Sequence, residues 1–240
     1  MSVVKWEKDG GVAILTMTNG ANRQNRIFAL EMLAALNEIV ADTSVQSVVL
    51  TSSDEKNFSQ GVDVDWLMER FGAEDHQAIK DFMYGMNGVF KTLLLLPVPV
   101  IAAINGHAFG NGAILSCACD FRFMRADKGY FCFPEVDIGI PFLPGMIAFV
   151  KKAIPYYKFQ EMKYTGRRYG APELEKHNII VKSCANREEL MKDAVEFART
   201  FQKKRGIFGE MKKRMHKEII DIIDSQDKPF IEALFLFIQE

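Results

Sequence analysis

Residues 98–118 read as a buried strand, a glycine-rich turn and the start of a helix of small apolar residues, and this pattern constrains the fold more than any other. The turn carries Gly106, Gly110 and Gly112. The first N–H groups of a helix lack intrahelical acceptors, and the peptide dipoles add at that end, so such a terminus favours negative charge. An enzyme that forms an oxyanion or an enolate needs donors of this kind at a fixed point.

Strand patterns alternate with helix patterns over the first part of the chain, and helices dominate after residue 141. Apolar residues at helical spacing predict the helices, and a turn at Gly10 and Gly11 predicts an N-terminal hairpin. This order is typical of an α/β fold with a helical C-terminal part. The predicted strands are the hairpin 6–17 and residues 47–51, 98–105, 120–125, 129–133 and 179–181; the predicted helices are 27–41, 65–71, 75–95, 113–119, 146–154, 156–165, 171–175, 187–204 and 211–224.

The composition excludes several classes of protein. The chain has 240 residues, 48% of them hydrophobic, a formal net charge of −1 and a pI near 6.5. This size allows one sizeable core, and the near-neutral charge gives no reason to expect a nucleic-acid or membrane surface. The longest apolar run, residues 93–103, is too short to span a bilayer. No N-terminal targeting signal stands out, so we expect a cytoplasmic protein.

The four cysteines show neither a CxxC pair nor a zinc-like spacing with histidine. They are expected to be reduced core thiols, and no metal site is expected. Residues 228–239 form a strongly apolar C-terminal segment, which is unsuited to a free solvated tail. Two interpretations of this segment stay open: a helix docked on the chain's own core, or a helix packed against a neighbouring subunit.

Two loops share one design. Residues 57–63 follow the strand 47–51, and residues 106–112 follow the strand 98–105. Each loop has glycine where a backbone must turn sharply or approach a ligand closely. At neighbouring strand ends, two such loops could aim two backbone N–H groups at one oxygen. Either loop alone is more often an ordinary turn than a functional one.

These segments, in this order and spacing, resemble the crotonase (enoyl-CoA hydratase/isomerase) superfamily. Each motif alone is weak, whereas the ordered set is specific. The resemblance covers about residues 3–200. The matching segments are residues 58–63 (FSQGVD), 99–112 (PVIAAINGHAFGNG), 119–122 (CDFR), 133–139 (FPEVDIG) and 165–167 (TGR), followed by Ala171.

The resemblance implies a crotonase (ClpP-like) spiral of ββα units, with residues 1–185 as the core and residues 186–240 as a helical trimerisation region. It also implies an acyl-CoA thioester substrate whose oxygen would lie between the backbone N–H groups of Val62 and Asn111. Asn111 stands where the superfamily usually has glycine, but a backbone donor survives this change. For CoA and substrate binding, the resemblance implies contacts from Arg23, Gln24, Gln60, Gly61, Val64 and Gly110.

Hydratases of this superfamily resemble one another in carrying two glutamates that together position and activate a water. The first position is Ile114 here, and the second is Glu135. Because a hydrocarbon can neither hold nor deprotonate water, the chain looks like the single-glutamate Δ3,Δ2-enoyl-CoA isomerases. A double-bond shift needs one base, which takes a proton from C2 and returns it to C4 while N–H donors hold the dienolate. Apolar neighbours such as Phe133 and Ile138 are expected to raise the pKa of Glu135.

Asp137 and His107 are the other titratable candidates in these motifs. In an extended segment Asp137 would point to the same side as Glu135, two residues away. It is therefore either a second acid/base or a structural hydrogen-bonding group. His107 lies in the glycine turn, where we favour packing or loop hydrogen bonding over catalysis.

The sequence therefore predicts a cofactor-free isomerisation of 3-enoyl-CoA to 2-trans-enoyl-CoA, with CoA present only as part of the substrate. The resemblance implies a homotrimer or a dimer of trimers, with neither nucleic acid nor membrane as a partner. Two alternatives stay open: a hydratase or another crotonase-type reaction, and a non-catalytic protein of this fold that binds acyl-CoA or a protein. The expected pocket walls are Trp66, Leu67, Phe82, Met83, Met86, Phe142 and Met146.

Overall fold

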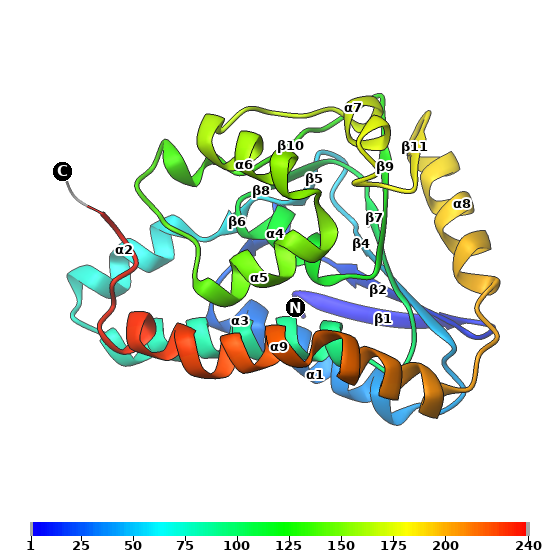
Figure 1. Ribbon diagram of the computed structural model, residues 1–240, viewed down its shortest axis with the longest axis horizontal. Coiled ribbons are helices and arrows are strands. Elements are labelled where there is room, and N and C mark those ends of the chain that lie inside the picture. Colours follow the sequence, from blue (N-terminus) through cyan, green and yellow to red (C-terminus); the bar gives the residue numbers. More distant parts are fainter. Residues whose placement is uncertain (1, 239–240) are drawn as a thin grey trace.

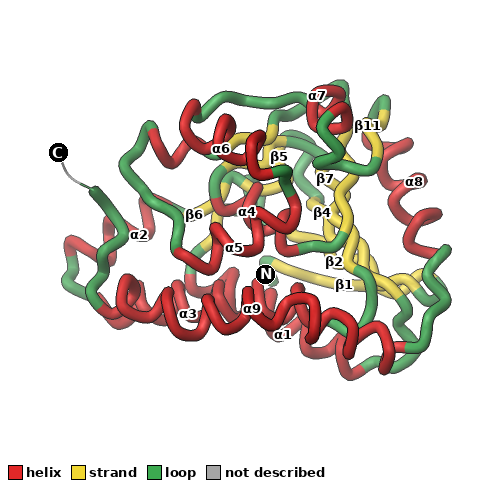
Figure 2. The backbone as a smooth tube through the Cα atoms, in the orientation of Figure 1, coloured by secondary structure: helices red, strands yellow, loops and turns green. Residues whose placement is uncertain are grey.

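A six-stranded sheet lies at the centre of the computed structural model, which describes residues 2–238 (Figures 1 and 2). Its order is β1-β2-β4-β7-β9-β11; β1 and β2 are antiparallel and the other neighbours are parallel. The hairpin turns at Gly10, whose φ of 61° favours glycine, so the predicted hairpin is confirmed. The strands are β1 (Val4–Asp9), β2 (Val12–Met17), β4 (Ser47–Ser52), β7 (Val100–Ile104), β9 (Phe121–Arg125) and β11 (Lys182–Cys184).

Two small sheets carry the glycine-rich loops. One has the order β10-β8-β5 and the other pairs β3 with β6. The sequence predicts loops over most of these segments, because two or three residues are too few to show an alternating pattern. The strands β2, β4 and β7 are each followed by one or two short strands and then a helix, which is the ββα repeat that the resemblance implies. The short strands are β3 (Arg23–Gln24), β5 (Asn57–Ser59), β6 (Gly61–Val62), β8 (His107–Phe109) and β10 (Phe131–Cys132).

The longer helices begin where polar side chains accept from their first N–H groups. Asn25 caps α1, Asp75 caps α3 and Asn186 caps α8, through side-chain oxygens 2.9–3.2 Å from backbone nitrogens. The helices are α1 (Arg26–Ala41), α2 (Val64–Gly72), α3 (His76–Leu95), α4 (Asn111–Ala118), η1 (Pro134–Val136, a 3₁₀ turn), α5 (Pro144–Ala153), α6 (Tyr156–Thr165), α7 (Ala171–Lys176), α8 (Arg187–Arg199) and α9 (Arg205–Glu232).

Apolar side chains fill both faces of the main sheet. The larger cluster includes Phe28 of α1, Phe90 of α3 and Phe149 of α5. The smaller cluster packs Leu190 and Ala194 of α8 against β4, β7 and β9. Helix α9 runs along one edge of the molecule, against α3 and α5 (bottom of Figure 1). Because α8 and α9 both pack on this core, the predicted C-terminal region is an integral part of the fold.

The predicted strand at residues 179–181 is wrong in position, since the strand that pairs with β9 is Lys182–Cys184. Ile179 and Ile180 are buried in the turn that precedes it. Their apolar character reflects burial in the core and not extended pairing, and a single sequence does not distinguish the two.

The C-terminal segment is partly helical and docks on the chain's own core. Helix α9 continues to Glu232, well beyond the predicted end at residue 224, and the following residues are not helical. Ile231 and Leu236 are buried, whereas Phe235 is half exposed. The first interpretation is therefore supported for residues 228–238; Gln239 lies outside the described residues.

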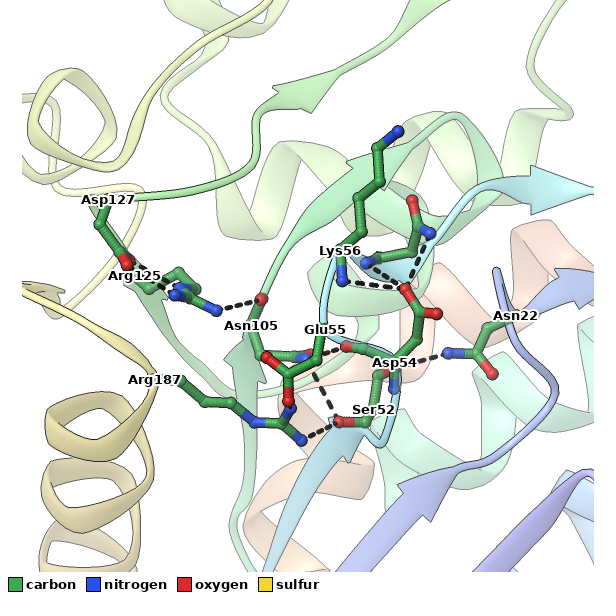
Figure 3. A network of polar contacts seen from close by, with 10 residues as sticks. Asn22, Ser52, Asp54, Glu55, Lys56, Asn105, Arg125, Asp127 and Arg187 are labelled. Carbon is green, nitrogen blue, oxygen red and sulfur yellow. Dashed lines mark hydrogen bonds and ion pairs between the residues drawn. The ribbon is translucent and has the colours of Figure 1, made fainter.

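A polar network at the ends of β4, β7 and β9 holds the loop of residues 53–60 (Figure 3). Asn105 donates through Nδ2 to Ser52 O (3.2 Å) and to Asp54 O (2.8 Å). Arg187 of α8 donates to the same Ser52 carbonyl at 3.1 Å. Buried backbone groups need such partners, so this network fixes the loop that precedes β6.

The four cysteines are free and buried, as predicted. Within residues 2–238 no cluster of His, Cys, Asp and Glu has the arrangement of a metal site. Over the same part of the chain, no helix is both long enough and apolar enough to cross a bilayer.

Lys212 anchors α9 to the core, and its removal should destabilise the fold. Its Nζ donates to Asp120 Oδ2 (2.8 Å) and to Leu93 O (3.0 Å). Lys212→Met would leave the partly buried Asp120 carboxylate without this cation, with Val100 N–H as a remaining donor, so we expect a loss of about 2 kcal/mol in the free energy of unfolding. Urea denaturation measures this loss. Lys217→Met, on the exposed face of the same helix, is the control and should change stability by less than about 0.5 kcal/mol; similar losses in both variants would contradict the anchoring role.

Candidate active site

A largely apolar cavity lies between α2, α3, the start of α4, η1 and α5. Within residues 2–238, Glu135 is the one acidic residue that lines it. Five of the seven expected wall residues line it, namely Leu67, Phe82, Met83, Phe142 and Met146. Trp66 and Met86 do not line the cavity; Trp66 instead packs edge-on against Phe82, with ring centroids 5.5 Å apart.

The two glycine-rich loops touch through their backbones at the mouth of this cavity. A Cβ atom on Gly61 would lie 2.7 Å from Phe109 O and 3.0 Å from Asn111 N, and a Cβ on Gly112 would lie 2.3 Å from Ser59 O. Gly61 also has a φ of 81°, which side chains rarely allow. Glycine is therefore required at both contacts.

The backbone N–H groups of Val62 and Asn111 are available to a ligand. Asp63 N–H donates to Gln24 O (2.8 Å) in the β3–β6 pair. Because successive N–H groups of a strand point in opposite directions, the N–H of Val62 points away from β3. Asn111 is the first residue of α4, and the first helical bond is from Ile114 N to Gly110 O (3.0 Å), so Asn111 N–H has no intrahelical acceptor. Both residues line the cavity.

A buried chain of side-chain hydrogen bonds ties these two loops to a third. Asn111 Nδ2 donates to Gln24 Oε1 (2.5 Å), and Gln24 Nε2 donates to Ser59 Oγ (3.1 Å). Ser59 Oγ donates in turn to Asn22 O (2.7 Å). Asparagine at position 111, unlike glycine, can hold the start of α4 in this way. The side chain of Gln24 thus faces the interior, so it orders the loops and does not face the cavity.

Glu135 lies in η1 with its side chain almost completely buried. Its Oε1 faces the turn before α4, 3.2 Å from the position that a Cβ of Gly110 would occupy. Burial raises the pKa of Glu135 to about 7, against the lowering effect of the Lys163 charge. A carboxyl group with this pKa can accept and return a proton near neutral pH.

Lys163 of α6 is the ionisable neighbour of Glu135 that sequence reasoning missed. Its Nζ lies 3.8 Å from Glu135 Oε2 and 3.5 Å from the centroid of the Phe142 ring. Burial lowers the pKa of Lys163 to about 8. No single-sequence signal marks this residue, because a lysine on an amphipathic helix is typical of a solvated face.

Ile114 lies on the wall of the cavity, one turn into α4, and is buried. The carboxylate that a two-glutamate site would carry there is replaced by a hydrocarbon. The cavity therefore offers one proton-transfer group next to two N–H donors.

Asp137 does not line the cavity, but it borders a neighbouring recess together with Glu135 and Lys163. Residues 134–136 form a 3₁₀ turn and not an extended segment, and the Asp137 carboxylate lies against Gly166. The extended geometry on which the expectation of a shared side was based is therefore wrong. His107 is outside the cavity and accepts from Tyr130 N–H through Nδ1 (3.3 Å), which agrees with the interpretation as loop hydrogen bonding.

The residues expected to bind CoA are spread around the mouth of the cavity. Gln60, Val64 and Gly110 line it. Arg23 is half exposed and pairs with Asp65 at 2.6 Å, so its guanidinium is already partly neutralised. The assignment of these residues to CoA stays a prediction.

Comparison with models of protein families matches residues 7–227 to the family described as enoyl-CoA hydratase/isomerase. The chain is 28% identical over 235 residues to enoyl-CoA delta isomerase 2, peroxisomal, of Arabidopsis thaliana, with 93% of this chain and 96% of that protein covered. It is 31% identical over 196 residues to short-chain-enoyl-CoA hydratase of Clostridium acetobutylicum, with 80% and 72% covered.

The fold has close structural counterparts. An enoyl-CoA hydratase from Bacillus halodurans superposes with a TM-score of 0.85, at 21% identity, over 98% of this chain and 95% of that chain. This likeness confirms the α/β architecture and its helical C-terminal part. The match of the family model over most of the sequence agrees with the motifs around Gly61, Gly110 and Glu135. The chain therefore belongs to the enoyl-CoA hydratase/isomerase family.

Proposed function

We propose that the chain is an isomerase that converts 3-enoyl-CoA to 2-trans-enoyl-CoA. The observation that carries this proposal is the pairing of one buried carboxylate, Glu135, with a hydrocarbon at Ile114 across an apolar cavity. The relatives include enoyl-CoA delta isomerases as well as a hydratase and dehydratases, so the family alone leaves the reaction open.

The chemistry requires one base and one anion-binding site. The Glu135 carboxylate takes a proton from C2, and the electron pair moves into the C1–C2 bond as the thioester oxygen gains negative charge. The N–H groups of Val62 and Asn111 stabilise this dienolate oxygen. The C1–C2 π electrons then move to form the C2–C3 double bond, the carbonyl is restored, and the C3–C4 double bond breaks as its electron pair takes the proton from the Glu135 carboxyl group at C4. All protons and electrons are accounted for by the substrate and this one side chain.

Hydration fits the cavity less well. Addition of water requires a group to hold and activate it in addition to a group that protonates the carbon. Ile114 supplies neither a donor nor an acceptor, and the remaining walls near Glu135 are mainly apolar. The same argument supports a reaction without a cofactor, because proton transfer at a thioester α-carbon needs only a base and oxyanion donors.

We also propose that the chain acts as a homo-oligomer, a trimer or a dimer of trimers. Ile207, Met211 and Met215 are spaced four residues apart on one face of α9, and all three are more than half exposed. An apolar stripe of this kind favours contact with another subunit. The cytoplasmic location stays a prediction.

The decisive experiment is to incubate the purified protein with 3-enoyl-CoA and, separately, with 2-enoyl-CoA of several chain lengths. Chromatography and mass spectrometry follow the products. An isomerase interconverts the two without a change in mass, whereas a hydratase adds the mass of water to 2-enoyl-CoA. Hydration without isomerisation would overturn the proposal, and binding without either product would favour the non-catalytic alternative.

Glu135→Gln should abolish most of the isomerisation and retain binding. The amide keeps the shape of the side chain but cannot take the C2 proton, so we expect kcat to fall by about 100- to 10,000-fold. Steady-state kinetics measure the loss, and calorimetry with a saturated acyl-CoA measures binding. Asp137→Asn should keep near-normal activity, because its carboxylate lies against Gly166. An equal loss in both variants would restore Asp137 as a second acid/base.

The rate should depend on pH through Glu135. Because the base must be ionised and its pKa is raised to about 7, kcat/KM should be constant above this pH and fall about tenfold per pH unit below it. A pH–rate profile between pH 5 and pH 9 tests this. An acid limb near the ordinary glutamate pKa of about 4 would contradict the role of the buried carboxyl group.

Phe237 should limit the length of the acyl chain. The segment after α9 returns past α2 (Figure 1), where Phe237 packs on Phe71 with ring centroids 5.6 Å apart and lines the cavity. Phe237→Ala would open this wall, so kcat/KM should shift towards longer acyl chains. Phe235→Ala, on an exposed neighbour, is the control. An unchanged chain-length profile in Phe237→Ala would contradict this assignment.

A further inference from the structure

Two polar atoms beside the cavity have no hydrogen-bond partner among the described residues 2–238. They are Glu135 Oε2 and Lys163 Nζ, both buried, at a separation of 3.8 Å. This distance allows an ion pair but is too long for a hydrogen bond. A buried charge without a partner is strongly unfavourable, so each group depends on the other for its charged form.

The position of Lys163 is determined by its surroundings. The ammonium lies over the Phe142 ring, 3.5 Å from its centroid, and Phe142 also lines the acyl cavity. The face of an aromatic ring attracts a cation. The ring therefore stabilises the ammonium without placing a second carboxylate next to it. Lys163 lines a second recess, which shares Glu135, Ile140 and Pro141 with the cavity, and is not among the residues that line the cavity itself. The two oxygens of Glu135 thus face different groups: Oε2 faces Lys163, and Oε1 faces Gly110 and the start of α4.

Other charged and titratable groups near the pair do not replace either partner. Asp137, in the same turn, directs its carboxylate against Gly166. Cys132 of β10 donates to Gly166 O (3.0 Å), and Arg168, after α6, stacks on Phe109. Within residues 2–238, Lys163 forms its ion pair with Glu135, and the start of α4 contributes backbone N–H groups on the opposite side of the carboxylate.

We propose that Lys163 is a positioning residue for Glu135: its ammonium draws Oε2 away from the cavity and keeps the carboxylate ionised, which leaves Oε1 to exchange the proton with the substrate. Lys163 itself stays outside the cavity and does not touch the substrate. The kinetic part of this inference rests on the proposed isomerase function, whereas the ionisation of Glu135 can be measured without any substrate.

The substitution that separates these effects is Lys163→Met, which keeps an unbranched side chain, one atom shorter, and removes the charge. Loss of an opposite charge at this distance should raise the pKa of Glu135 by about 1 to 3 units. The ¹³C carboxyl resonances of glutamate, with Glu135→Gln to assign the signal, report this titration directly. The matched control is Lys158→Met, which removes a buried lysine from the same helix that pairs with Glu161 and Glu173 instead.

We expect the measured pKa of Glu135 to be higher in Lys163→Met and unchanged in Lys158→Met. In the kinetic arm, kcat/KM of Lys163→Met should fall about fivefold or more at pH 7 and recover as the pH rises above the raised pKa of Glu135, which a purely structural defect would not do. If the pKa of Glu135 in Lys163→Met equals its pKa in the unmodified protein, the inference is overturned. Absence of isomerisation in the unmodified protein would overturn only the proposed function.

A reciprocal measurement covers the case in which Lys163→Met does not fold. Glu135→Gln removes the other partner, so the ammonium of Lys163 should lose its proton at a lower pH than in the unmodified protein. The ¹³Cε resonance of lysine reports this titration, with Lys163→Arg to assign the signal. An unchanged Lys163 titration would show that the two groups are not coupled and would overturn the proposal.

Discussion

The direct contact between two loop backbones is the constraint on which the site depends. Gly61 lies against Asn111, and Gly112 lies against Ser59, at separations that leave no room for a Cβ atom. This contact places the N–H groups of β6 and α4 at the mouth of one cavity. The hydrogen bonds from Asn111 to Gln24 and from Gln24 to Ser59 then keep the loops in place. The polar network below them, around Asn105, joins the loops to the ends of the parallel strands.

Burial is the second physical factor that shapes the site. Burial among the apolar walls of the cavity raises the pKa of Glu135 to about 7, and burial lowers that of Lys163 to about 8. Full neutralisation of either group would remove the charge that the proposed chemistry needs. A compensating pair of opposite charges at 3.8 Å allows a carboxylate to persist in a largely hydrocarbon environment. Burial of charged side chains lowers the stability of the fold. Such burial is expected at functional sites, where reactivity requires it.

Most of the architecture follows from local patterns in the sequence. The hairpin around Gly10, the buried strands β4 and β7 and the long amphipathic helices α1 and α3 all occur where periodicity predicts them. The position of β11 was not predictable, because Ile179 and Ile180 are apolar for burial in a turn. The short strands β3 and β6 also carry no periodic signal, although their pairing directs the Val62 N–H away from the β3 strand and towards the cavity.

At the site, residue identity and spacing along the chain predict the chemical types: one glutamate, two glycine-rich turns and a hydrocarbon at position 114. Which of these groups meet depends on the folding of segments that are distant in the chain. The 3₁₀ turn at residues 134–136 directs the Asp137 carboxylate against Gly166, the segment after α9 places Leu236 and Phe237 in the cavity wall, and α6 brings Lys163 to Glu135. Ion pairing and burial act between elements that are distant in the chain. Local periodicity predicts helices and strands, but it does not predict which of them come into contact.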